Sequence, residues 1–231
     1  PGGAASVRDA RRNAFALLSE LGLLEHPGAA RLLDSLDEQT RSVTATMIEH
    51  GINSPRTSSM GRLFDAAAAI LGICDKATYE GEPAIELEAA AWRALDNEIA
   101  HFPDDNAGYF ASGPSWLDGP YVLDQKALFE ALLGGIEAGA PADRLALDFH
   151  VAVARSSARI AREICAREDI DTVALSGGVF MNQLLLQLLT RELKDAGLTV
   201  LVPQTVPVND GCIAYGQAAV ARTRLAQVAP Q

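Results

Sequence analysis

The sequence predicts a helix-rich α/β fold, and the strongest evidence lies in its last third. Residues 172–175 and 199–203 are short runs of β-branched and apolar residues, as expected of strands. Ser176-Gly177-Gly178-Val179 leads from the first run into a leucine-rich helix that stops at Gly197, and another helix follows from about Asp210. This order of strand, glycine pair, helix, strand and helix is typical of α/β folds and predicts two parallel strands.

The preceding part of the chain predicts a series of helices, because apolar residues recur there at helical spacing. Ser58 or Ser59 is placed to cap the helix that starts at Met60, and Gly22 is placed to end the first helix. Residues 101–124 are punctuated by proline and glycine and predict a loop with up to two short strands. The predicted helices cover residues 6–22, 37–50, 60–71, 85–95, 125–134 and 142–167.

Length and composition limit the class of protein. The 231 residues suffice for one large domain or two small ones. We divide them into a helical part, residues 1–100, and an α/β part, residues 101–231, which contains the glycine pair. A net charge of −11 without a basic stripe argues against a nucleic-acid partner. No apolar run reaches the ~20 residues of a membrane helix, so no membrane partner is expected.

The cysteines and histidines form no recognisable site of their own. The cysteines, Cys74, Cys165 and Cys212, are widely spaced and include no CxxC pair, which argues against a disulfide framework or a zinc ribbon and favours a reducing, cytoplasmic location. No HxxxH or HExxH pair is present, so no self-contained zinc site is predicted. His150 follows Phe149 in the long helix and is expected to be packed there.

The glycine pair is the first candidate for ligand binding. Gly177 and Gly178 would let the backbone approach a ligand closely, and the helix that follows would offer free N–H groups and its positive dipole end. Asn182, expected just inside this helix, would bond the ligand or cap the turn. A glycine pair after a strand is also an ordinary tight turn, so the residues alone leave both interpretations open.

Several carboxylates are further candidates. Asp65 is the only charge in a strongly apolar stretch, so it either faces water or holds something specific. Glu86 and Glu88 lie near the start of a helix, where the dipole favours acidic residues without any function. Asp210 precedes a helix of small residues, where it would act as an N-cap, as a metal ligand or as a group near a phosphate.

Four segments together resemble a known family. They are residues 58–66 (SSMGRLFDA), 79–88 (YEGEPAIELE), 175–182 (LSGGVFMN) and 208–217 (VNDGCIAYGQ). Their order is that of the C-terminal region of the HypF family, the carbamoyltransferases of [NiFe]-hydrogenase maturation. The resemblance spans about residues 53–221 and is specific as an ordered set.

The resemblance implies the C-terminal part of an actin/Hsp70-like (ASKHA) ATPase core, related to the tRNA threonylcarbamoyl-transferring proteins. It implies that Asp65 and Glu86 hold the nucleotide ribose, and that Gly177, Gly178 and Asn182 contact the nucleotide. The turn at Gly81 and Glu82 would lie beside it, and Asp210 would be a ligand of a divalent metal, either iron, zinc or magnesium. The catalytic residues themselves are not predicted.

The resemblance also implies a reaction and its partners. In the whole enzyme, carbamoyl phosphate and ATP form carbamoyl-adenylate, and the carbamoyl group passes to the C-terminal cysteine of a HypE-like acceptor. The upstream domains of the family and its histidine pair are absent here, and Pro1-Gly2-Gly3 resembles the middle of the transferase domain. We therefore expect a portion of a larger enzyme. The alternatives are a small-molecule O-carbamoyltransferase or a non-catalytic docking piece.

Overall fold

The computed structural model describes residues 1–97 and 122–228 and places ten α-helices, three 3-10 helices and two short strands in them. Predicted strands within residues 101–121 lie outside this part. In chain order the elements are α1 (Ala4–Arg8), α2 (Ala10–Leu21), η1 (Pro27–Ala29), α3 (Ala30–Ser35), α4 (Glu38–Glu49), α5 (Met60–Ile70), α6 (Glu82–Asn97), α7 (Gln125–Glu137), α8 (Ala142–Glu168), β1 (Thr172–Ala174), η2 (Gly178–Met181), α9 (Gln183–Asp195), β2 (Thr199–Leu201), η3 (Asp210–Cys212) and α10 (Ile213–Val228).

The predicted pair of parallel strands is confirmed. β1 and β2 pair in parallel, with Thr172 opposite Thr199 and Val173 opposite Val200. Helix α9 makes the crossover between them and packs its leucine face against α8. A parallel pair needs such a crossover, because the chain must return to the same end of the sheet before the second strand begins.

The prediction of one continuous helix over residues 6–22 is wrong in one respect. The structure has two helices there, α1 and α2, with a break at Asp9. The Asp9 backbone is extended, and its carboxylate caps α2 and pairs with Arg11 at 2.6 Å. Backbone bonds on both sides of the break join it to residues 75–77 (Ala10 N to Asp75 O, 3.0 Å; Ala77 N to Arg8 O, 2.7 Å). This pairing with a distant segment displaces the local helical bonds.

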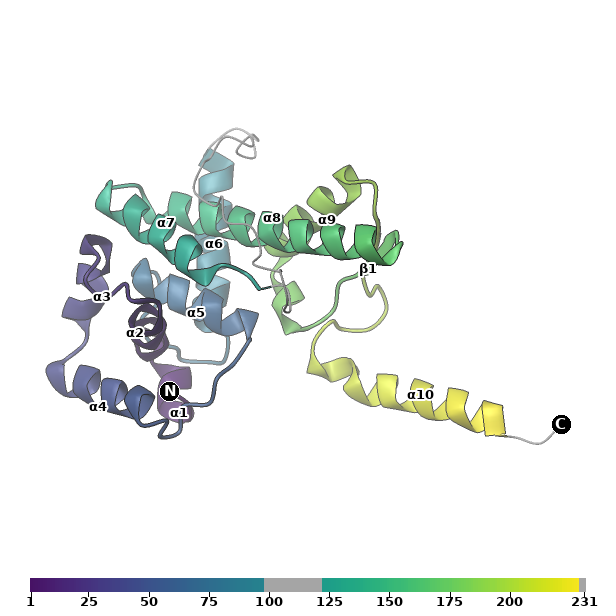
Figure 1. The fold of residues 1–231 in the computed structure, drawn as a ribbon, viewed down its shortest axis with the longest axis horizontal. Coiled ribbons are helices and arrows are strands. Elements are labelled where there is room, and N and C mark those ends of the chain that lie inside the picture. Colours follow the sequence, from purple (N-terminus) through teal and green to yellow (C-terminus); the bar gives the residue numbers. More distant parts are fainter. Residues whose placement is uncertain (98–121, 229–231) are drawn as a thin grey trace.

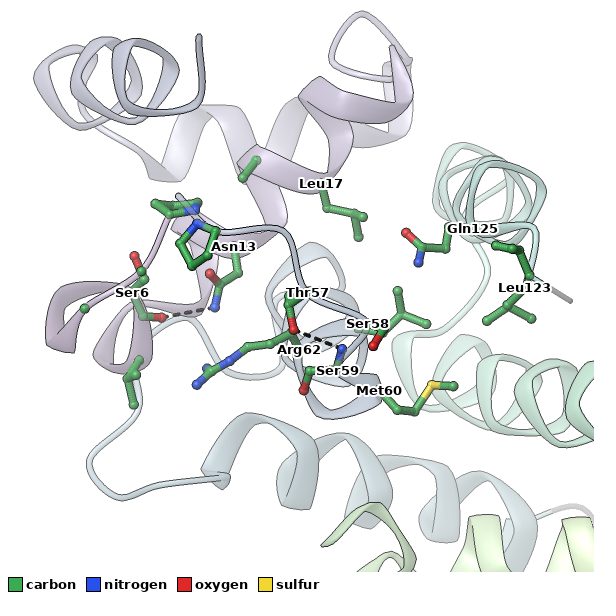
Figure 2. Close-up of a pocket in the computed structure, with 18 residues that line it drawn as sticks. Ser6, Asn13, Leu17, Thr57, Ser58, Ser59, Met60, Arg62, Leu123 and Gln125 are labelled. Carbon is green, nitrogen blue, oxygen red and sulfur yellow. Dashed lines mark hydrogen bonds between the residues drawn. The ribbon is translucent and has the colours of Figure 1, made fainter. Parts of the chain in front are cut away.

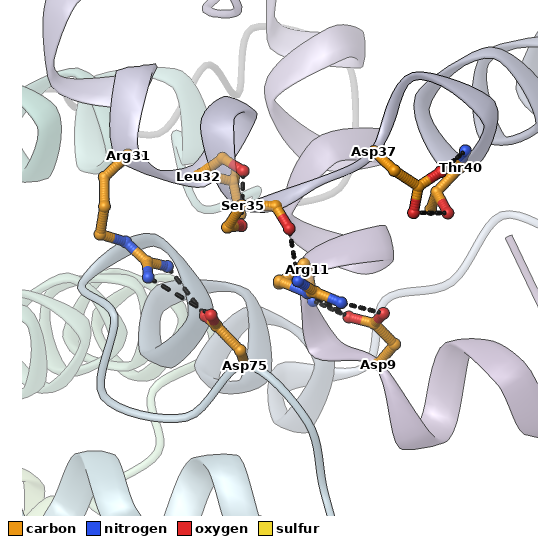
Figure 3. A network of polar contacts seen from close by, with 8 residues as sticks. All are labelled: Asp9, Arg11, Arg31, Leu32, Ser35, Asp37, Thr40 and Asp75. Carbon is orange, nitrogen blue, oxygen red and sulfur yellow. Dashed lines mark hydrogen bonds and ion pairs between the residues drawn. The ribbon is translucent and has the colours of Figure 1, made fainter.

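Polar contacts extend from this break to the neighbouring helices (Figure 3). Arg11 also donates to the backbone carbonyl of Ser35, and Arg31 on α3 pairs with Asp75 at 2.8 Å. Helix α3 is an element that the sequence does not predict. The helix predicted over residues 37–50 is present as α4, and Asp37 is its N-cap, since its carboxylate accepts from Thr40 N at 2.7 Å.

Other helix ends differ slightly from their predictions. Gly22 ends α2 in the left-handed conformation, as predicted. Ser59 is the N-cap residue of α5, yet its side chain makes no capping bond. Helix α7 passes through Gly134, where it was predicted to stop, and ends at Glu137. Gly135 faces α8 so closely that a Cβ there would overlap the Leu145 side chain, so this glycine serves helix packing rather than termination.

One hydrophobic core joins the predicted helical and α/β parts. Every residue of α5 from 63 to 70 is buried, and α8 packs against α6, α7 and α9 around it. At the centre the Phe149 ring lies 5.2 Å from Phe64 and 5.9 Å from Phe129. Core residues therefore come from both sides of residue 100.

Helix α10 lies apart from this core. Figure 1 shows it running away from the other helices, and its apolar side chains are exposed, with Tyr215 at 67% and Leu225 at 72%. Among the helices of residues 1–97 and 122–228, none combines the length and the apolar character required to cross a membrane.

Candidate functional site

The glycine pair forms a turn between β1 and α9. Gly177 adopts φ 114° and ψ 157°, a conformation that side-chain-bearing residues rarely adopt. Its N–H donates to the carbonyl of Val208 at 2.8 Å, so this turn lies beside the segment that leads to Asp210. The structure therefore brings together two segments that are about thirty residues apart in the sequence.

Asn182 was predicted to lie just inside the helix, but it is the N-cap of α9. The difference arises because the 3-10 helix η2 separates Gly177 from α9. Its Oδ1 accepts from Leu185 N at 2.8 Å, and its Nδ2 lies 2.9 Å from His150 Nε2 on α8. Of the two roles left open for Asn182, the capping role is therefore present. Both polar ends of its side chain are used within the protein.

The predicted free N–H groups at the start of α9 are not free. Glu88, from α6, accepts from Gln183 N at 2.7 Å and from Leu184 N at 3.1 Å. Asn182 N donates to Val179 O at 3.1 Å, and Leu185 N is capped by the Asn182 side chain. All four N–H groups that a helix start leaves without helical partners are thus satisfied. The expectation that this terminus offers donors to a ligand was wrong.

The turn itself retains unpaired donors. Within the part of the chain that the structure describes, the N–H groups of Gly178 and Val179 have no hydrogen-bond partner. Gly178 is exposed, and a Cβ at either glycine of the pair would meet nothing within 4 Å. The backbone of the turn, rather than the end of α9, is therefore the part that a ligand can reach.

Asp65 is buried in α5, with 8% of its surface exposed. Its carboxylate pairs with Arg62, one turn earlier, at 3.0 Å. Burial raises the pKa of this carboxyl, and the charge and hydrogen bond of Arg62 act in the opposite direction. Asp65 therefore holds a partner and is not a solvated helix position.

The acidic residues of the α6 region differ in their surroundings. Gly81 has φ 83° and precedes α6, and Glu82 accepts hydrogen bonds from Thr78 N and, at 2.8 Å, from Thr78 Oγ1. These bonds lower the pKa of Glu82. Glu86 is exposed one turn further along. In this helix it is Glu88 that reaches α9, a contact across 95 residues that the sequence does not indicate.

Asp210 offers one carboxylate only. It is exposed at the start of η3, where Asn209 accepts from Gly211 N at 3.0 Å and acts as the cap. No cluster of three or more histidine, cysteine or acidic side chains suited to a metal occurs within the described ranges.

A separate pocket lies among α1, α2, α5 and the start of α7 (Figure 2). It has a volume of about 700 Å³ and is lined by α1, α2, the residues before α5 and the start of α7. Arg62, the partner of Asp65, lines it together with Asn13 and Leu17. None of the ligand-binding residues predicted from the sequence lines this pocket.

Comparison with known families decides where this chain belongs. Residues 1–217 match the HypF family model described as "Carbamoyltransferase, Kae1-like Domain, second subdomain". The chain belongs to the HypF carbamoyltransferase family. It is 37% identical, over its whole length, to a protein of Cupriavidus necator named carbamoyltransferase HypF homolog, of which it covers 57%.

Solved structures and a more distant relative agree with this assignment to the HypF family. A crystal structure of full-length HypF in a phosphate- and nucleotide-bound form matches 97% of the chain with a TM-score of 0.81 and 27% identity. The chain covers 28% of that protein. A tRNA N6-adenosine threonylcarbamoyltransferase of Clostridium perfringens is 28% identical over 73% of the chain, and the chain covers 47% of it. The prediction of a partial, helix-rich actin/Hsp70-like domain is confirmed.

Substituting Glu88 tests the observed link between α6 and α9 in this HypF chain. We expect Glu88→Ala to lower the free energy of unfolding by about 1–2 kcal/mol, because two N–H groups of α9 lose their acceptor. Glu86→Ala is the matched control, since Glu86 is exposed on the same helix and should change stability by less than about 0.5 kcal/mol. Urea unfolding measures both variants. Equal free energies of unfolding for Glu88→Ala and Glu86→Ala would contradict the capping role of Glu88.

Proposed function

We propose that this chain supplies one half of a nucleotide site that holds carbamoyl-adenylate, formed from ATP and carbamoyl phosphate, in a HypF carbamoyltransferase. The carrying observation is the junction at the start of α9, where the turn of Gly177 and Gly178 meets the segment before Asp210 and is held by α6 and α8. The unpaired N–H groups of Gly178 and Val179 are suited to a phosphate oxygen. The family relationship supports the same site.

The remaining candidate residues receive roles on this proposal. Asp65 and Glu86 would hold the ribose through their carboxylates, and Gly81 and Glu82 would lie beside the nucleotide. Asn182 would act by holding the turn, since its side chain is engaged within the protein. Asp210 would be one ligand of a divalent metal (iron, zinc or magnesium), which as a bound Lewis acid polarises a carbamoyl or phosphoryl oxygen.

The proposed transfer takes place on a partner protein. The thiolate of a C-terminal cysteine on a HypE-like acceptor attacks the carbamoyl carbon, the bond from that carbon to the adenylate oxygen breaks, and AMP leaves. The thiol gives up its proton, and the acceptor gains a thiocarbamate. The nucleophile comes from the partner, so this chain needs to supply binding and orientation only. The preceding domains of a HypF protein would supply the rest of the site.

Calorimetric titration with ATP and with an AMP analogue, each with and without divalent metal, tests the nucleotide half of the proposal. We expect binding by the chain alone or by the chain mixed with the preceding part of a HypF protein. Asp65→Asn should weaken it at least about tenfold. Asp34→Asn, an exposed substitution in α3, should leave it unchanged. A folded chain that binds no nucleotide in either form would contradict the proposal.

The transfer step needs a separate readout. Mass spectrometry of the C-terminal peptide of a HypE-like acceptor should show a carbamoyl group only when ATP, carbamoyl phosphate and the preceding part of the enzyme are all present. Carbamoylation of a small hydroxylated molecule instead would favour an O-carbamoyltransferase. Nucleotide binding without either product would leave the chain a docking piece.

A further inference from the structure

His150 is a buried titratable group that the proposed reaction does not use. It lies on α8 with 0% of its surface exposed. Its Nδ1 lies 2.7 Å from the carbonyl oxygen of Ala146, and its Nε2 lies 2.9 Å from Asn182 Nδ2. A carbonyl only accepts, so Nδ1 must carry the hydrogen and Nε2 must be the acceptor. Asn182 Nδ2 is then the donor, which leaves Asn182 Oδ1 free to accept from Leu185 N.

The ring of His150 is fixed on its other sides by aromatic side chains. Phe64 meets it edge-on at 5.1 Å, and Phe149 does so at 6.4 Å. Phe64 is the residue before Asp65 in α5. The contact between Phe64 and His150 therefore joins α5, which carries the buried Asp65 carboxylate, to α8. Burial also lowers the pKa of His150 to about 4, against the effect of its bond to Ala146, so the ring is neutral at neutral pH.

Backbone hydrogen bonds within residues 177–182 connect Asn182, the residue that this ring contacts, to the glycine turn. Asn182 N donates to Val179 O at 3.1 Å, Phe180 N donates to Gly177 O at 3.0 Å, and Gly177 N donates to Val208 O at 2.8 Å. The orientation of the Asn182 carboxamide decides whether Leu185 N, in the first turn of α9, is capped. His150 sets that orientation. Because His150 Nε2 is a hydrogen-bond acceptor, the Asn182 amide nitrogen turns toward it, and Asn182 Oδ1 is left facing Leu185 N.

We infer that His150 is a positioning residue of the HypF nucleotide site: it orients Asn182, and through Asn182 it holds the Gly177–Gly178 turn in its binding conformation. The function of this arrangement rests on the proposed nucleotide site. Glu88 secures the next two N–H groups of α9 independently of His150. His150 therefore governs the residue that joins the turn to the helix.

Three variants of the 231-residue chain test this inference. His150→Leu removes the acceptor, whereas His150→Gln keeps one donor and one acceptor, as neutral imidazole has. Phe129→Leu is the matched control, since Phe129 is equally buried and touches Phe149 but belongs to α7. We expect His150→Leu to weaken ATP binding at least about tenfold, and the other two variants to stay within about threefold of the original chain. Similar losses for His150→Leu and Phe129→Leu would overturn the inference.

Hydrogen exchange supplies a readout that does not depend on ATP. The exchange rate of the Leu185 amide, divided by that of Leu189 in the same helix, should rise at least about tenfold in His150→Leu and recover in His150→Gln. General destabilisation raises both amides together and leaves the ratio unchanged. If the original chain binds no ATP either alone or mixed with the preceding part of a HypF protein, the proposed nucleotide site fails. The exchange ratio still decides the positioning role in that case: an unchanged ratio in His150→Leu would refute it.

Discussion

Replacing Phe149 by alanine should lower the free energy of unfolding by about 3–5 kcal/mol, the largest effect expected of a single substitution in this protein. Its ring is fully buried and contacts Phe64 on α5, Phe129 on α7 and His150 beside it. The cavity would open where three helices meet, and close packing on all sides leaves little room for collapse.

Chemical denaturation of Phe149→Ala measures this loss. Tyr215→Ala is the control, because Tyr215 on α10 is 67% exposed and its removal should change stability by less than about 0.5 kcal/mol. A loss below about 1.5 kcal/mol for Phe149→Ala would mean that the three helices close over the cavity. The aromatic cluster would then not be the centre of the core.

Asn182→Ala should lower the free energy of unfolding by about 2–4 kcal/mol. Loss of the cap on Leu185 N accounts for about 1 kcal/mol. The rest comes from the buried His150 Nε2, which loses its donor, at a cost of about 1–3 kcal/mol. Asn182 is thus a structural residue as well as a candidate nucleotide residue.

Two further variants separate the contributions of Asn182. Asn182→Asp keeps the acceptor for Leu185 N but cannot donate to His150, so its loss should be smaller than that of alanine. Asn209→Ala removes a comparable cap from the three-residue η3 and should cost no more than about 0.5 kcal/mol. Thermal and urea unfolding give all three values. Unchanged stability in Asn182→Ala would show that the observed bonds contribute nothing to folding, and would favour a direct contact with the ligand.

The sequence by itself determined the local elements and the family. Short runs of β-branched and apolar residues identified both strands, and Gly22 marked a helix end because capping depends on the residue at one position and its immediate neighbours. The leucines of α9 follow the helical period and indeed face the core. The four short segments identified the HypF family, and the matched residues 1–217 confirm it.

The tertiary structure alone decided what the candidate residues touch. The break at Asp9 results from backbone pairing with residues 75–77, and no local pattern encodes a partner so far along the chain. Glu88 resembled an ordinary acidic residue near a helix start, yet it caps a helix 95 residues away. His150 was expected to be packed, which is correct, but its bond to Asn182 crosses 32 residues. Periodicity and capping signals are local, whereas hydrogen bonds between buried side chains depend on which helices the hydrophobic core brings together.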